Sequence, residues 1–169
     1  EEWKNSADIK GTQLVFCDLS TPKKPYSEYE YGKDFDAYND LKHKLIERGI
    51  PENEIAFIHD ANTDSAKQDL FDKINAGAVR VLIGSTEKCG TNVQKRLVAI
   101  HHLDAPYRPR DLIQRNGRCI RQGNMNKGIR IYTYATERTF DSYSYQILEN
   151  KQRFISQVEK GDMTVREAE

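Results

Sequence analysis

The residues best suited to chemistry lie in the segment QRNGRCIRQG, residues 114–123. If this segment is helical, Gln114, Arg118 and Arg121 fall at i, i+4 and i+7, so one edge presents an amide and two guanidinium groups. A guanidinium group is planar, permanently charged and able to donate two parallel hydrogen bonds to phosphate oxygens. The spacing therefore predicts a polyphosphate site in which Arg118 and Arg121 stabilise charge on a phosphoryl group during its transfer. The ordinary alternative is a pair of solvated surface arginines.

A second segment, residues 79–94, offers groups that suit a nucleic-acid backbone. It reads as a buried strand that stops at Ser85 and Thr86, followed by a glycine-containing loop with Thr91. Such a strand end exposes backbone N–H groups and hydroxyls that can meet phosphates. An ordinary strand-to-helix turn uses the same residue types, so that reading stays open. His59 ends an earlier apolar run and is a further candidate contact, although a lone histidine there is more often structural.

The charge distribution requires any nucleic-acid binding to be local. The chain has 26 basic and 26 acidic residues, so there is no whole-molecule basic field. Charge is nevertheless segregated, because between residues 108 and 138 only Asp111 and Glu137 oppose a group of cations. These cations are Arg108, Arg110, Arg115, Arg118, Arg121, Lys127, Arg130 and Arg138.

Alternating strand and helix patterns predict the elements that position these residues. Short apolar runs indicate strands at 13–17, 55–59, 79–84, 97–103 and 129–135. Helical spacing indicates helices at 35–48, 64–76 and 109–121, with Gly49 and Pro51 ending the first and Thr63 or Asp64 capping the second. This order predicts an α/β fold with a mostly parallel sheet covered by helices on both faces.

The last predicted element is a long helix from Phe140 to Val158. Its apolar stripe is expected to cover the sheet, and a connection to a further segment is the alternative. We divide the chain into an N-terminal tail (residues 1–11), one α/β lobe (residues 12–136) and a C-terminal helix and tail (residues 137–169).

Bulk properties narrow the class of protein. With 169 residues and a mean hydropathy of −0.80, the chain suits one compact polar domain. Three widely spaced cysteines without a C-x-x-C pair argue for a reducing compartment and against zinc, and we expect no metal site. Neither a signal region nor a membrane span is indicated, so we predict a cytoplasmic protein. The start at Glu1 rather than at methionine suggests a fragment of a longer polypeptide.

Three segments together resemble the C-terminal, RecA-like lobe of superfamily-two helicases. Gln114, Gly117, Arg118 and Arg121 match the Q-x-x-G-R-x-x-R pattern of motif VI, and the following Gln-Gly is similar to the Swi/Snf-type version. Residues 79–94 resemble motif V, although the loop is shorter than in Swi/Snf proteins, and residues 12–20 resemble motif IV. The whole chain is also similar to the helicase part of helicase/DNA-adenine-methylase proteins of plasmids and conjugative elements.

The resemblance implies the second lobe of an ATP-dependent helicase or translocase. Arg118 and Arg121 would act on ATP, and Gln114, Gly90 and Asn92 would lie near it. The partners implied are nucleic acid, with DNA favoured over RNA, an N-terminal RecA-like lobe of the same polypeptide and a fused methylase domain.

The sequence lacks G-x-x-x-x-G-K-[ST] and an acidic D-E-x-H-like box. ATP and Mg²⁺ would therefore be held mainly by the absent first lobe, and the chain alone should hydrolyse ATP poorly or not at all. Two alternatives are a non-catalytic interaction module with a RecA-like fold and a free-standing flavodoxin-type domain.

Overall fold

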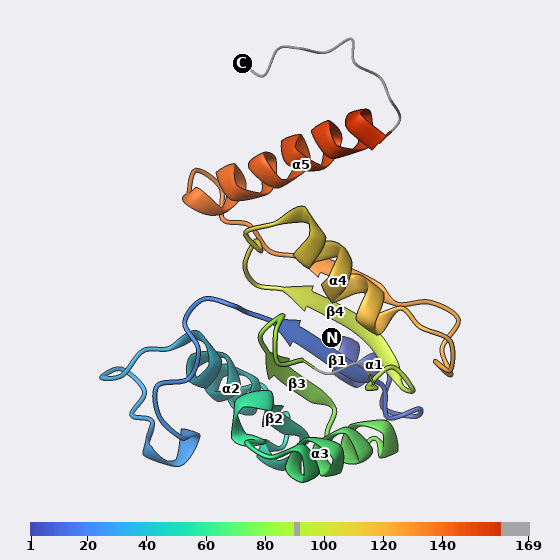
Figure 1. Cartoon of the computed structure of the whole chain (residues 1–169). Coiled ribbons are helices and arrows are strands. Elements are labelled where there is room, and N and C mark those ends of the chain that lie inside the picture. The colour runs from blue at the N-terminus through green and yellow to red at the C-terminus, as the bar shows by residue number, and fades with distance from the viewer. Residues whose placement is uncertain (90–91, 160–169) are drawn as a thin grey trace.

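The structure, a computed structural model, describes residues 1–89 and 92–159, without the side chains at positions 118, 119 and 159. Its centre is a parallel five-stranded sheet in the order β2-β3-β1-β4-β5 (Figure 1). The strands are β1 (Thr12–Phe16), β2 (Ile55–Phe57), β3 (Val81–Gly84), β4 (Leu97–His102) and β5 (Arg130–Thr133). All five strands expected from the sequence are present, and the α/β class with a parallel sheet is confirmed.

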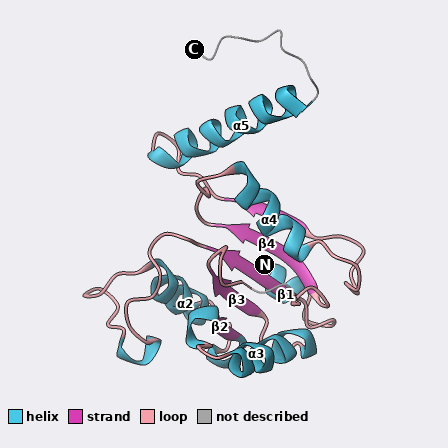
Figure 2. Ribbon diagram, viewed as in Figure 1, coloured by secondary structure: helices cyan, strands magenta, loops and turns pink. Residues whose placement is uncertain are grey.

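Helices pack on both faces of the sheet, and one further helix lies beyond its edge (Figure 2). They are α1 (Glu2–Asn5), α2 (Ala37–Glu47), α3 (Asp64–Ala76), α4 (Pro109–Cys119) and α5 (Phe140–Glu159), with short 3-10 turns at Tyr26–Glu28, Glu52–Glu54 and Ile58–Asp60. The Thr63 side chain caps α3 by accepting a hydrogen bond from the Ala66 N–H, and Gly77 ends that helix at φ +79°. A left-handed residue at this position favours glycine.

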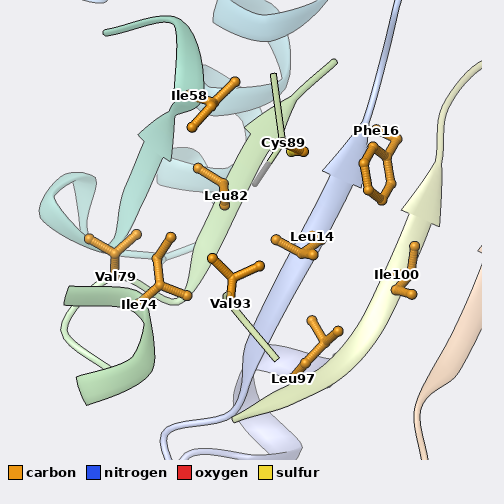
Figure 3. Close-up of a cluster of buried hydrophobic side chains, with 10 residues drawn as sticks. All are labelled: Leu14, Phe16, Ile58, Ile74, Val79, Leu82, Cys89, Val93, Leu97 and Ile100. Carbon is orange, nitrogen blue, oxygen red and sulfur yellow. The ribbon is translucent and has the colours of Figure 1, made fainter. Parts of the chain in front are cut away.

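Two apolar layers hold the sheet to its helices, because successive strand residues point to opposite faces. Leu14, Phe16, Leu82 and Ile100 point to the face covered by α3, where Ile74 completes the layer (Figure 3). On the other face, buried strand residues pack against α2; these are Val15, Cys17, Ile55, Phe57, Val81 and Ile83, with Tyr38 from the helix. The core therefore fixes the strand ends in place on both sides.

The first eleven residues are anchored to the sheet rather than free of it. Within α1, the Trp3 indole N–H donates to the Glu54 carboxylate at 2.6 Å. The Arg80 guanidinium group donates to the Trp3 carbonyl at 2.6 Å and lies 4.9 Å from the indole ring centroid. The N-terminal tail, residues 1–11, therefore contains a short helix, and its Trp3 packs against Arg80.

Helix α5 does not cover the sheet, and the expectation that it would is wrong. It packs on α4, beyond the edge of the sheet (Figure 1). Leu148 is buried in that contact, whereas most of the apolar stripe stays exposed, namely Phe140, Tyr143, Phe154, Ile155 and Val158. The stripe showed that this segment is helical, but its amphipathic pattern did not say which element it packs against.

A row of aromatic rings crosses β4 and β5 on the face opposite α4. His101 stacks on Tyr132 with ring centroids 5.0 Å apart, and its Nδ1 lies 2.9 Å from the Tyr134 hydroxyl. The His101 Nε2 lies 3.0 Å from Oε1 of Gln13. Burial lowers the pKa of His101 to about 4, so the ring is neutral near pH 7.

We expect this histidine to make the protein less stable in mild acid. The pKa of His101 is about 4 in the folded protein and about 6.5 in an unfolded chain, so the unfolded chain binds more protons between these values. Its contribution to stability is therefore lost as the pH falls from about 6.5 towards 4. Urea unfolding at pH 7 and pH 4.5 should show a smaller decline for His101→Gln than for the wild type and for His43→Gln. Parallel declines in all three proteins would contradict the assignment.

Candidate functional site

A cleft of about 640 Å³ opens where the strands end. In a parallel sheet all carboxyl ends lie at one edge, which is where ligands of open α/β folds bind. The cleft is lined by Asp18 and Thr21 after β1, His59 after β2, residues 85–88 after β3, and Asp111 and Gln114 of α4. The structure therefore brings together four residues predicted from separate segments: Gln114, Ser85, Thr86 and His59.

Arg121 does not continue the helical edge that was expected from the sequence. Helix α4 ends at Cys119, where the Ile120 N–H donates to the Asn116 carbonyl at 2.8 Å. Arg121 is exposed just beyond this end and lines a separate hollow with residues 120–129. The expected helix to Arg121 was thus two residues too long. Arg118 lies in the last turn of α4, and its side chain is outside the described residues.

The remaining predicted residues lie in or next to the loop after β3. Gly90 and Thr91 are outside the described residues. Asn92 is exposed, and its carbonyl accepts a 2.6 Å hydrogen bond from the Asn75 amide in α3. Their predicted roles at ATP or nucleic acid stay predictions.

Beneath the cleft lies a buried charge network centred on Arg115, which has no exposed surface. Its Nη2 donates to Oδ2 of Asp18 at 2.7 Å and to Oδ1 of Asp104 at 3.0 Å. Its Nη1 donates to the Asp104 carbonyl at 3.0 Å, and its Nε donates to the Thr86 hydroxyl at 2.6 Å. One side chain of α4 therefore contacts the ends of β1, β3 and β4.

Each acidic partner of Arg115 also binds backbone or hydroxyl groups. Asp18 accepts from the Thr86 N–H at 2.6 Å and from the Thr86 hydroxyl at 2.7 Å. Asp104 accepts from the N–H groups of Asp18 and Leu19 at 2.6 and 2.8 Å. Burial by itself would raise the pKa of Asp18, but the hydrogen bonds from Thr86 and Arg115 outweigh it and lower the pKa. Asp18 is therefore ionised at neutral pH.

A histidine completes the network on the α4 side. His102 is buried and stacks on Phe16 at 5.7 Å between ring centroids. Its Nδ1 accepts from Nη1 of Arg115 at 3.4 Å, and its Nε2 lies 2.9 Å from Oδ1 of Asn116. A neutral ring with the proton on Nε2 satisfies both contacts, and burial lowers the pKa of His102 accordingly. The His102 ring thus packs within the buried network.

The network limits how Thr86 could contact nucleic acid. Its side chain is buried and its hydroxyl is engaged by Asp18 and Arg115, so any contact with nucleic acid has to compete with these bonds. Ser85 is more accessible and lies at the mouth of the cleft. At the same mouth, His59 packs edge-on against Tyr38 and has a buried Nδ1 without a partner in the described part of the chain.

The charges that line the cleft are mixed. Lys88 brings a positive charge, whereas Glu87 and Asp111 bring negative ones, and the charge of Asp18 is offset by that of Arg115.

Across residues 1–89 and 92–159 there is no group of three His, Cys, Asp or Glu side chains that could hold a metal ion. The same residues contain no helix that is long and apolar enough to span a membrane.

The sequence analysis missed Arg115, Asp18 and Asp104 as a unit. Two signals were present: an aspartate follows both the β1 and the β4 apolar runs, and Arg115 lies on the inward side of α4 between Leu112 and Asn116. Neither signal identifies which residues pair with one another, because Asp18 and Asp104 are 86 residues apart in the sequence.

Comparison with known proteins gives one consistent answer. Residues 11–123, more than half of the chain, match the family described as helicase conserved C-terminal domain. A stretch of 82 residues is 30% identical to the defense against restriction protein B of Escherichia phage P1. That stretch covers 48% of this chain but 4% of that much longer relative.

Solved structures of low sequence identity share the fold. The C-terminal part of the Fun30 ATPase domain matches with a TM-score of 0.62 at 18% identity, over 87% of this chain and 42% of that chain. The C-terminal domain of a Dbp5 variant from S. cerevisiae, bound to Gle1 and IP6, matches with a TM-score of 0.56 at 18% identity, over 92% and 77%. These likenesses confirm the RecA-like α/β fold.

Proposed function

Because the chain belongs to the helicase conserved C-terminal domain family, we propose that it is the second lobe of an ATP-dependent helicase or translocase. The observation that carries this proposal is the cleft at the strand ends, which is lined by Gln114 of α4 together with Ser85 and His59. Residues from the predicted ATP-side and nucleic-acid-side segments thus meet in one place. The resemblance of residues 114–121 to motif VI supports the same assignment.

In this proposal Arg121 and Arg118 act on the phosphates of ATP, with Gln114, Gly90 and Asn92 close to the nucleotide. Guanidinium groups that enter the site from a second lobe neutralise the charge of a leaving phosphoryl group. Mg²⁺ fits this chain poorly, because the described residues offer no cluster of ligands. We assign Mg²⁺ and most ATP contacts to a first RecA-like lobe, which makes that lobe the principal partner.

We propose that nucleic acid crosses the loop after β3, with Ser85, Thr91 and His59 as contacts and Thr86 at their base. Such contacts grip the backbone and carry little sequence preference. DNA is favoured over RNA by the resemblance to plasmid proteins, which also motivates a fused methylase as a further partner. We expect the protein to act in the reducing cytoplasm, where a buried cysteine such as Cys17 stays a thiol.

The test compares this chain alone with a complete protein that also contains the first lobe. We expect the chain alone to hydrolyse no ATP above background, because it lacks a phosphate-binding loop. The complete protein should hydrolyse ATP faster when a DNA oligonucleotide is added, and its DNA affinity should fall steeply with salt. DNA binding without any ATP hydrolysis by the complete protein would favour the interaction-module alternative instead.

A further inference from the structure

Helix α4 presents different residues to its two sides. Gln114 is exposed and lines the cleft, whereas the next residue, Arg115, is fully buried among the strand ends. Figure 1 shows α4 lying along β4, with its first turn near the carboxyl ends of the strands. A displacement of the inner side of this helix therefore also displaces the outer side, because the helix is rigid over so short a length.

The guanidinium group of Arg115 has no N–H donor to spare for a ligand. Its five donors meet five acceptors: the Thr86 hydroxyl, the Asp104 carbonyl, Nδ1 of His102 and one carboxylate oxygen each of Asp18 and Asp104. Phe16 lies against the group, with the guanidinium carbon 5.5 Å from the ring centroid. Arg115 thus acts through the groups that it holds.

The loop after β3 is attached to this same group by its first residues. Thr86 binds Arg115 directly through its hydroxyl and indirectly through both oxygens of Asp18. Ser85, its neighbour, lies at the mouth of the cleft. A ligand that moves this loop has to stretch the 2.6 Å bond between Thr86 and Arg115 or move α4 with it.

We infer that Arg115 is a positioning residue that couples the nucleic-acid-side loop at Ser85 and Thr86 to the ATP-side helix α4. This inference rests on the proposed function and goes beyond it, because it names the link between the two halves of the site. The link is short, buried and fully hydrogen-bonded, so in a low-dielectric interior it transmits displacement instead of absorbing it.

The experiment uses the complete protein with both lobes and measures the ratio of ATP turnover with and without a DNA oligonucleotide. Arg115→Lys keeps the positive charge between the aspartates but cannot reproduce the forked geometry. Thr86→Val removes the hydroxyl on the other side, and Thr86→Ser restores it. We expect Arg115→Lys and Thr86→Val each to lower the ratio at least about fivefold, the lower end of ordinary coupling. Thr86→Ser should keep it.

Two comparisons separate coupling from simple loss of stability. Ile74→Val in α3 destabilises the core without touching the network, and it should leave the ratio within about twofold of the wild type. The double variant Arg115→Lys with Thr86→Val should lower the ratio no further than either single change, because both break the same link.

The outcomes distinguish this inference from the proposed function. A wild-type ratio in Arg115→Lys, or fully additive effects in the double variant, overturns the coupling role and leaves the helicase assignment standing. If Arg115→Lys does not fold, the contrast between Thr86→Val and Thr86→Ser, measured at saturating DNA so that a change in DNA affinity does not affect the ratio, decides the question. Wild-type protein without DNA-stimulated ATP turnover overturns the proposed function itself.

Discussion

Replacing Arg121 or Arg118 with alanine should lower the ATP turnover of the complete two-lobe protein by about a thousandfold, within the range of arginine fingers. Arg121 is exposed just beyond the end of α4, and Arg118 lies in the last turn of that helix. Without the guanidinium groups, charge on the departing phosphoryl group would be stabilised by the first lobe alone. Steady-state phosphate release measures the effect.

A matched control variant distinguishes loss of catalysis from loss of folding. Arg153 is exposed in α5 and pairs with Glu149 at 3.2 Å, away from the cleft. Arg153→Ala should keep wild-type turnover, and both it and Arg121→Ala should unfold within about 0.5 kcal/mol of the wild type. Wild-type turnover in both Arg118→Ala and Arg121→Ala would remove these arginines from the mechanism.

Replacing Arg115 with methionine should lower the free energy of unfolding by about 3–5 kcal/mol, the usual cost of removing one partner of a buried ion pair. Methionine fills much of the same space, so the loss reports charge and hydrogen bonds more than a cavity. Asp18 and Asp104 would be left facing each other, 2.7 and 3.0 Å from the vacated Nη2 position. Urea denaturation at pH 7 of this chain gives the measurement.

The control for stability is the same substitution at an exposed arginine, Arg121→Met, which should change the free energy of unfolding by about 0.5 kcal/mol or less. At acid pH, Arg115→Met should lower the free energy of unfolding by less than it does at pH 7. Because the pKa of Asp18 is lowered in the folded protein, its contribution is present above its ordinary pKa of 3.8 and lost as the pH falls below it. A loss below about 1 kcal/mol for Arg115→Met would show that the network contributes little to stability.

Local patterns predicted most of the fold. Apolar runs located all five strands to within a few residues. The signal is clearest for β1 and β3, which are buried on both faces, whereas most of β5 is exposed. Helix α3 was predicted with its observed bounds, because Thr63 caps one end and Gly77 the other. Helix α4 was overextended, because Arg121 continues the helical spacing after the backbone has left the helix.

The candidate site was predictable in part. Gln114, Ser85, Thr86 and His59 were chosen from three segments, and parallel strands place their carboxyl ends at one edge, so these residues line one cleft. The hydrogen bonds of Thr86 to Asp18 and Arg115 were not predictable, because both partners lie far from Thr86 in the sequence.

The sequence by itself determined the strand and helix pattern, the parallel α/β class and the family resemblance, and it supplied the residues that we predict to bind phosphate. These properties depend on side-chain type and spacing along the chain. The tertiary structure alone decided that Arg115 of α4 is buried, that Asp18 and Asp104 share it, and that α5 packs on α4. These outcomes depend on contacts between segments far apart in the sequence, where the free energy of burying a charge is set by partners that the local pattern does not contain.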